Sequence, residues 1–207
     1  MTSGWKTLAE KLGRSLRVAL LGAPLLLGPA ASWAFDLDGL MAQLAASKGG
    51  DARFTEQRFV RGVEGPLESR GTLSFSPPDK LVRRTESPRE ESMVVDGNTL
   101  TLSRGGRTRT MALDSMPEVR GMVDAMRGTL NGDGRILKQQ FRSTLSGTEA
   151  SWALQLQPLD DRLAAQVRSM RLTGRGGDVL GIEMELIGGD RSVMRITPAR
   201  AAAKAPS

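Results

Sequence analysis

The sequence contains no cysteine and no histidine, and this double absence removes several classes of chemistry. Without these residues the chain cannot form a disulfide, a thiol nucleophile, a histidine-based triad or the common zinc sites. Carboxylate, lysine, serine or threonine chemistry remains, but the serines and lysines lie in no recognisable nucleophile motif. The composition therefore argues against an enzyme, and we expect no metal and no cofactor.

Two pairs of adjacent acidic residues are the remaining candidates for acid–base catalysis. Glu90 and Glu91 form one pair, and Asp160 and Asp161 form the other. Neighbouring residues on a strand point to opposite faces of a sheet, so the members of such a pair do not converge on one substrate. Solvated charges at turns are the better interpretation of both pairs.

Aromatic residues are scarce as well, since tyrosine is absent and the chain has 3 tryptophans and 5 phenylalanines. Proteins that bind single-stranded nucleic acid stack bases on aromatic side chains and gather their basic residues into a patch. Here the basic residues are interspersed with acidic ones, as in RGVEGPLESR at 61–70. Nucleic acid is therefore not an expected partner, despite a formal net charge of +6.

The first 34 residues have the pattern of a cleavable signal peptide. Four basic residues precede an apolar run, VALLGAPLLLG at 18–28, which is too short to span a bilayer comfortably. Small residues stand at Ser32 and Ala34, the two positions that signal peptidase recognises, so we predict cleavage after Ala34. An uncleaved anchor is the alternative, disfavoured by the two prolines in this region and by the small residues.

The predicted mature chain begins at Phe35, where a bacterial lipoprotein would carry a lipid-modified cysteine. We therefore expect a periplasmic, monomeric protein with no stable membrane anchor. Loss of the leader removes four basic residues and one acidic residue, which lowers the formal net charge by three. About 170 residues remain, enough for one domain, which we place at 35–198. The patternless ARAAAKAPS at 199–207 is expected to be a disordered tail.

Hydrophobic periodicity predicts two helices. The first follows Asp36, a capping residue, and ends at KGG (48–50). The second begins at Pro117 and ends near Gly132, and a short helical turn is predicted at 135–139.

Elsewhere apolar and polar residues alternate with the period of two that is typical of strands. Glycine-rich turns such as DGN at 96–98 and RGGR at 104–107 join neighbouring strands as hairpins. This pattern predicts an antiparallel, mainly β domain with one apolar and one polar sheet face. The strands are predicted at 52–60, 68–76, 80–86, 91–96, 99–103, 107–114, 140–146, 151–157, 167–174, 179–187 and 191–198.

The apolar face of this sheet is long, and the two predicted helices provide little cover for it. A strongly curved sheet around a cavity would fit this imbalance. Several methionines lie on the apolar stripes, and their flexible thioethers suit varied apolar guests. Ordinary core packing is the alternative interpretation of these residues: Met93, Met111, Met122, Met126 and Met184.

Three successive segments resemble the LolA-type carriers of outer-membrane lipoproteins: FTEQRF at 54–59, GTLSFSPPDKLVRR at 71–84 and ESMVVDGNTLTL at 91–102. The order and spacing of the motifs agree over nearly all of residues 36–198. Within that superfamily the chain is most similar to the divergent LolA-related proteins, which share PLESRGTL and a terminal GDRSV. The resemblance implies an α+β, mainly β fold, namely an incomplete, strongly curved antiparallel β-barrel of about eleven strands. Its helices would form a lid over an apolar cavity.

The resemblance also implies binding rather than catalysis. It describes a soluble periplasmic carrier that takes acyl chains of lipoproteins, or another lipid-like cargo, from an inner-membrane exporter to an outer-membrane acceptor. A lipid-binding or lipoprotein-binding sensor or accessory module of the same fold is the alternative, although such sensors usually carry a further domain or an anchor. The inner face of the lid helix would comprise Val119, Met122, Val123, Met126 and Leu130. The lipid-binding cavity would be lined by Leu73, Phe75, Leu81, Met93, Val95, Leu100, Leu102, Met111, Leu113, Trp152, Leu154, Leu156, Met184 and Leu186.

The sequence departs from the carriers at one position. They have an arginine before a conserved proline, which helps to hold the lid by hydrogen bonds to helix carbonyls, and Pro77 stands there instead. Arg83 and Arg84 are the nearest substitutes as rim charges, and only one of two adjacent strand residues can point to the cavity mouth. Arg83 is the candidate if it shares a side with Leu81, and a solvated arginine at a strand edge is the alternative.

Overall fold

The structure, a computed structural model, describes residues 35–199, and all of these belong to one compact unit. The predicted signal peptide at 1–34 lies outside the described residues, as does the predicted tail apart from Ala199. None of the helices in the described range is long and apolar enough to cross a membrane.

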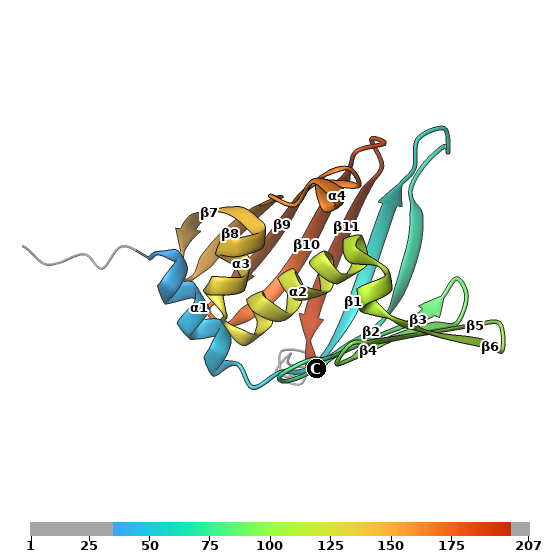
Figure 1. Ribbon diagram of the computed structural model, residues 1–207, viewed down its shortest axis with the longest axis horizontal. Helices are drawn as coiled ribbons and strands as arrows, with labels where there is room; N and C mark the ends of the chain where they lie inside the picture. The colour runs from blue at the N-terminus through green and yellow to red at the C-terminus, as the bar shows by residue number, and fades with distance from the viewer. Residues whose placement is uncertain (1–34, 200–207) are drawn as a thin grey trace, which may run out of the picture. The chain divides into compact units, whose positions relative to one another are not determined.

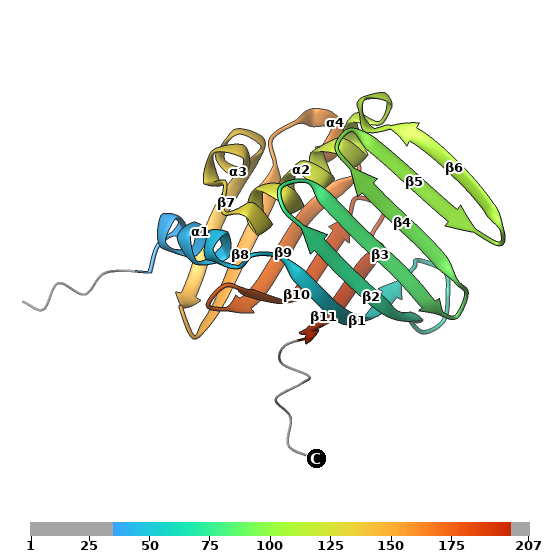
Figure 2. The ribbon, with the colours of Figure 1, turned by 90° about the horizontal axis from the view of Figure 1, so that it is seen from below.

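Eleven antiparallel strands form one curved sheet whose two edge strands do not pair with each other (Figures 1 and 2). The chain starts at the middle of the sheet with β1 and meanders to the edge at β6. It then crosses to the opposite edge at β7 and meanders back until β11 pairs with β1. The predicted incomplete, strongly curved barrel is thus confirmed. The strands are β1 Gly50–Phe59, β2 Leu67–Ser76, β3 Lys80–Ser87, β4 Glu91–Asp96, β5 Thr99–Arg104, β6 Arg107–Ala112, β7 Phe141–Thr148, β8 Ser151–Pro158, β9 Val167–Arg175, β10 Asp178–Leu186 and β11 Arg191–Pro198.

The helices lie on the concave side of the sheet, and three of them carry the chain across it from β6 to β7 (Figure 2). This crossing is made by the short 3-10 helix η1 (Leu113–Ser115), then by α2 (Pro117–Asn131) and α3 (Gly134–Gln140). The N-terminal α1 (Leu37–Ala46) packs against α2 and α3, and α4 (Asp161–Ala164) packs against α2.

The helix ends follow from a few capping residues. The Asp36 side chain accepts a hydrogen bond from the backbone N–H of Gly39 at the start of α1. Pro117 occupies the first turn of α2, where a backbone N–H would have no helical partner. Gly132 ends α2 with a φ of 69°, and a Cβ atom there would lie 2.1 Å from the Met41 carbonyl oxygen. Only glycine therefore lets α2 end against α1 at this point.

The predicted strands are all present, with ends that differ by about two residues at most. Leu113 differs from its prediction, because it begins η1 instead of lying within the strand predicted at 107–114. The helix α4 was not predicted. It begins where Asp160 accepts hydrogen bonds from the backbone N–H groups of Arg162 and Leu163, so this acidic residue is a helix cap.

The apolar face of the sheet is buried in two separate clusters of side chains. The large core joins β7–β10 to all four α-helices and contains Leu154 and Leu172. The small core joins β4 and β5 to η1 and the start of α2 and contains Val95. Helix α2 contributes to both, with Ala125 in the large core and Val123 in the small core. Between the two cores lie the strands in the middle of the sheet, β1, β2, β3 and β11.

Candidate functional site

The strand register determines which of the predicted cavity residues share the concave face. Side chains of directly opposed residues in antiparallel strands lie on the same face. One row across the sheet runs from β2 to β6 through Phe75, Leu81, Val95, Leu100 and Met111. The adjacent row on the same face runs through Leu73, Arg83, Met93, Leu102 and Arg109.

These two rows differ in how far they are covered. Val95 and Leu100 are buried in the small core, and Leu81 and Met111 pack against it. In the adjacent row, Met93 and Leu102 are 37% and 36% exposed. They oppose each other across β4 and β5 and form an apolar surface that we call the open patch. Arg83 and Arg109 flank it in the same row.

The predicted cavity residues on the other half of the sheet pack directly against helices. Trp152, Leu154 and Leu156 are buried in the large core, and Met184 and Leu186 pack against its edge. This half of the concave face is therefore closed by packing.

The predicted lid residues lie on α2 and are divided between the two cores. Val123 is buried in the small core with Val119 beside it, whereas Met122 packs against the large core. Met126 and Leu130 are half-buried. Helix α2 thus packs onto the concave face through Met122 toward the large core and through Val119 and Val123 toward the small core.

Two hollows in the surface lie away from this face. One, of about 480 Å³, lies beside α1 and the turn between α2 and α3, and Asp38 and Lys138 are among its lining residues. The other, of about 400 Å³, is lined by residues of β7–β10, including Ala153 and Thr173, which point away from the large core. Neither hollow is the predicted apolar cavity.

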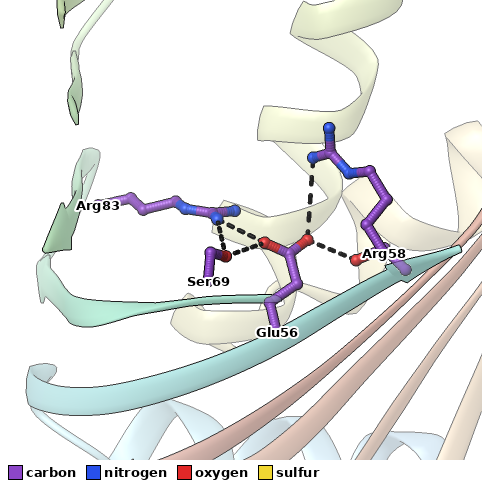
Figure 3. Close-up of polar contacts among 5 residues, drawn as sticks. Glu56, Arg58, Ser69 and Arg83 are labelled. Carbon is purple, nitrogen blue, oxygen red and sulfur yellow. Dashed lines mark hydrogen bonds and ion pairs between the residues drawn. The ribbon is translucent and has the colours of Figure 1, made fainter. Parts of the chain in front are cut away.

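A buried carboxylate interrupts the apolar face between the two cores. Glu56 is 5% exposed, and the alternation along β1 places it on the same side as the buried Phe54. Its oxygen atoms accept hydrogen bonds from Ser192 at 2.5 Å and from Ser69 at 3.2 Å. Figure 3 shows the carboxylate standing between the side chains of two arginines that come from opposite sides.

Those two arginines pair with Glu56 at different distances. The Nη2 atom of Arg83 lies 2.5 Å from Oε2, whereas the Nη2 atom of Arg58 lies 3.9 Å from Oε1. We call this group the Glu56 cluster. Its members come from β1, β2, β3 and β11, and they are Glu56, Arg58, Ser69, Arg83 and Ser192.

Arg83 reaches the carboxylate by lying across the concave face. Its guanidinium is 4.6 Å from the centroid of the Phe54 ring, a cation–π contact. Gly71, which opposes Phe54, has no side chain to block this path, and a Cβ atom there would lie 1.9 Å from the Arg84 carbonyl oxygen. Arg83 therefore shares the inner side with Leu81, whereas Arg84 is exposed on the other side.

The cluster keeps Glu56 ionised. Burial by itself raises the pKa of Glu56, but the hydrogen bond from Ser192 and the positive charge of Arg83, with a smaller effect from Arg58, outweigh it. The pKa of this carboxyl is therefore below its ordinary value of 4.5. Two guanidinium groups and one carboxylate leave the cluster with a net positive charge at neutral pH.

Helix α2 is fastened to the rim of the sheet by two side chains that were not predicted. Arg127 donates from Nε to the Asp79 carbonyl and from Nη2 to the Gly97 carbonyl, both at 2.8 Å. Asn131 donates to the Pro78 carbonyl at 2.6 Å. The donors are thus on the helix and the acceptors are in the β2–β3 and β4–β5 turns, the reverse of the arrangement expected from the resemblance. Val123, Arg127 and Asn131 follow one another at intervals of four residues. This spacing in the sequence would have placed the three side chains on one side of α2.

The acidic pairs considered for catalysis have structural partners. Glu91 forms an ion pair with Arg104 at 3.0 Å, and Asp160 caps α4. Across residues 35–199 there is no group of three side chains that could hold a metal ion.

The fold resembles those of several solved structures with low sequence identity. One is the LolA superfamily protein NE2245 from Nitrosomonas europaea, with 9% identity, a TM-score of 0.44, and coverage of 78% of this chain and 91% of that chain. Another is the lipoprotein LppX from Mycobacterium tuberculosis, with 10% identity, a TM-score of 0.42, and coverage of 78% and 93%. The MucA/MucB complex of Pseudomonas aeruginosa gives 17% identity, a TM-score of 0.41, and coverage of 83% and 61%.

The family of this protein is shown by its amino-acid sequence. Curated proteins give no match to this chain. Residues 29–207, which include the whole described domain, match the family described as "Outer membrane lipoprotein carrier protein LolA-like". The predicted resemblance is confirmed by this match over most of the chain. The chain belongs to the LolA-like family of outer-membrane lipoprotein carrier proteins.

Proposed function

We propose that this protein binds an acyl chain, from a lipoprotein or another lipid-like molecule, on the concave face of its sheet. It carries that cargo through the periplasm from an exporter in the inner membrane to an acceptor in the outer membrane. The observation that supports this function most directly is the open patch. Met93 and Leu102 lie side by side on the concave face, yet these two apolar residues are 37% and 36% exposed.

Binding at such a site requires no chemical reaction, because the burial of apolar surface provides the free energy. Each methylene group that leaves water contributes about 0.8 kcal/mol to binding. A methionine in the patch suits chains of different shape, because its thioether adapts to the surface of a guest. Release then depends on an acceptor whose own apolar site competes for the same chain.

The open patch is too small to cover a long acyl chain, and the adjacent apolar surface lies under α2. Movement of α2 away from the sheet would expose the row that contains Val95 and Leu100. The bonds from Arg127 and Asn131 to the rim turns oppose this movement. Loading is therefore coupled to the loss of the four hydrogen bonds that Arg127 and Asn131 make with the rim turns.

Binding is tested with the mature protein purified from the periplasm. Native mass spectrometry before and after lipid extraction is expected to show an adduct of acyl-chain mass. The extracted protein is expected to take up a fluorescent fatty-acid probe in a saturable manner. Protein that is strictly empty and also ignores such probes would contradict the proposal.

Carriage is tested separately, by the transfer of a labelled acyl cargo from donor vesicles to acceptor vesicles. A porous filter that the protein can cross keeps the two kinds of vesicle apart. The transfer rate is expected to rise in proportion to the concentration of the protein. Tight binding with no transfer would contradict a carrier and would leave a sensor or accessory role.

Export is also part of the proposal, because the acceptor lies beyond the inner membrane. Sequencing of the protein from a periplasmic fraction is expected to give Phe35 as the first residue. Recovery of the full leader in the membrane fraction would contradict the proposed processing after Ala34.

A further inference from the structure

The Glu56 cluster places buried charge in the middle of the concave face, between the two apolar cores. Burial of an ionised side chain is unfavourable unless the charge is paired and hydrogen-bonded, and apolar residues of similar volume often stabilise a fold equally well. The binding of an acyl chain alone gives no reason for charge at this position. The charge is accounted for if the cluster binds a second part of the ligand in addition to the chain.

The carboxylate of Glu56 already has a full set of donors. Its Oε2 atom faces Arg83 and Ser69, and its Oε1 atom faces Ser192 and Arg58. A cationic group on a ligand would have to displace these partners. Glu56 is thus unsuited to bind an amine.

The two arginines, in contrast, have donors to spare. A guanidinium carries five N–H donors. In its hydrogen bonds with the described residues, Arg83 donates only from Nη2, to Glu56 and Ser69. The Arg58 side chain is 56% exposed, and within residues 35–199 its one ion pair is the 3.9 Å contact with Glu56. Glu91, which lies on the concave face two residues before Met93, is paired with Arg104.

Apolar side chains lie directly beside these charges. Met93 opposes Arg83 on β4, and it begins the open patch. Met194 opposes Glu56 on β11, and Ile182 opposes Met194 on β10. A chain that extends from the cluster in either direction therefore meets apolar surface at once.

We propose that Arg58 and Arg83 bind the anionic head group of an amphiphile, a carboxylate or a phosphate monoester, whose acyl chain lies on the adjacent apolar surface. This inference rests on the proposed function and specifies the chemistry of its ligand. A guanidinium pairs with either anion through two parallel hydrogen bonds, which gives orientation as well as affinity.

Glu56 has a positioning role in this site. Its carboxylate holds the Arg83 guanidinium over the Phe54 ring, and the serines on β2 and β11 hold the carboxylate. Its negative charge also repels an incoming anion, so the affinity for the head group is moderate. Moderate affinity suits a carrier that must release its ligand.

The experiment compares four ligands with the same sixteen-carbon chain: hexadecanoate, hexadecyl phosphate, hexadecanol and hexadecyltrimethylammonium. Each displaces a fluorescent acyl probe from the full mature protein at low salt, below its micelle concentration. We expect the two anions to bind about tenfold or more tightly than hexadecanol, as charge-assisted hydrogen bonds would give. The cation is expected to bind no better than the alcohol. A difference between carboxylate and phosphate would show which source of anion the site prefers.

Two substitutions with opposite expected effects separate a head-group site from a structural ion pair. Arg83→Gln is expected to remove the preference for anions and to leave the affinity for hexadecanol within about threefold of the original. Glu56→Gln removes the repelling charge but keeps an oxygen that can accept a hydrogen bond from Arg83, so it is expected to tighten the binding of both anions. A purely structural pair would instead weaken all ligands in both variants. The control is Arg53→Gln, since Arg53 on β1 points to the opposite face, is 69% exposed and pairs with Glu86.

Each result bears on a distinct claim. Equal affinity of the original protein for hexadecanoate and hexadecanol would overturn the head-group site and leave acyl binding in place. Failure of all four ligands to bind would overturn the proposed function itself. If Arg83→Gln does not fold, the test depends on folded Glu56→Gln. Unchanged or weaker anion binding by Glu56→Gln would overturn the inference.

Discussion

At the scale of single residues, Glu56 is the one whose environment differs most from its sequence context. Read along β1, it is one polar residue among several, yet the strand's alternation turns it inward with Phe54. Donors from three other strands, β2, β3 and β11, surround its carboxylate. This side chain therefore connects four strands of the sheet, and stability should depend on its charge.

The protein is expected to lose stability as Glu56 becomes protonated. The folded state holds the pKa of Glu56 below its ordinary value of 4.5, so the unfolded chain takes up the proton first as the pH falls. The stabilising contribution is present above pH 4.5 and is lost as the pH falls through the lower pKa of the folded state. Urea unfolding between roughly pH 6 and pH 3 is expected to show a steeper decline for the original protein than for Glu56→Gln. Parallel declines would contradict this assignment.

Gly132 is a second position where one residue determines local structure. Its φ of 69° is unfavourable for other residues, and an added Cβ atom would lie 2.1 Å from the Met41 carbonyl oxygen. Gly132→Ala is therefore expected to lower the free energy of unfolding by about 2–4 kcal/mol, measured by urea titration. Gly188→Ala is the matched control, because a Cβ atom there would meet nothing within 4 Å. Equal stability of the two variants would mean that α1 and α2 can separate at this joint without cost.

At the scale of elements, a helix or strand could be predicted when it was long enough to show a hydrophobic period. The strands were predicted well, because each contains several alternations, and α2 shows four turns of a regular stripe. Helix α4 has only four residues, too few for any period to show. The fastening of α2 was hidden for another reason, since Arg127 bonds to backbone carbonyls 48 and 30 residues away. Every residue has a backbone carbonyl, so the sequence does not indicate which carbonyl accepts such a bond.

The fastening of α2 to the rim leads to a prediction about its mobility. Arg127→Met keeps much of the side-chain volume but removes the donors to Asp79 and Gly97. Because a hydrogen bond from a charged donor contributes about 1.5–3 kcal/mol, local opening of α2 should become roughly ten to a hundred times more frequent. Hydrogen exchange at the α2 amides, read by mass spectrometry, is the measurement.

The control for that experiment lies on the same helix. Arg120 is half-exposed and pairs with Asp114 and Asp124, so Arg120→Met removes a surface charge without touching the rim turns. Its exchange rates are expected to stay close to those of the original protein. Equal acceleration in both variants would show that loss of charge on α2, rather than the rim contacts, loosens the helix.

At the scale of the whole domain, the path of the chain explains why the concave face is divided between two cores. The crossing from β6 to β7 carries α2 over the middle of the sheet, and different residues of α2 pack into two different cores. The sequence predicted an apolar face and a helical cover but could not show how far the cover reaches. Leu154 illustrates this limit: it was predicted to line the cavity, yet it is 0% exposed in the large core. Leu154→Glu would bury an unpaired charge, so it is expected to unfold the domain rather than to report on uptake.

The open patch offers a better test of where cargo lies, because its residues can change without loss of the core. Leu102 is 36% exposed and opposes Met93 on one side and Arg109 on the other. Leu102→Glu is expected to change the melting temperature by only a few degrees, as surface substitutions usually do. Its affinity for hexadecanol, a ligand without charge, should fall by about tenfold or more, because the acyl chain would have to desolvate the new carboxylate.

The matched control places the same charge one residue away. Thr101 precedes Leu102 on β5 and points to the opposite face, where its hydroxyl lies 3.5 Å from that of Thr110. Thr101→Glu therefore adds a carboxylate to the outer surface and should leave hexadecanol affinity unchanged. Comparison of the two variants removes the effect of net charge and isolates the face of the sheet. If folded Leu102→Glu binds hexadecanol as well as Thr101→Glu does, the acyl chain does not lie on the open patch, and the cargo must occupy the part of the concave face beneath α2.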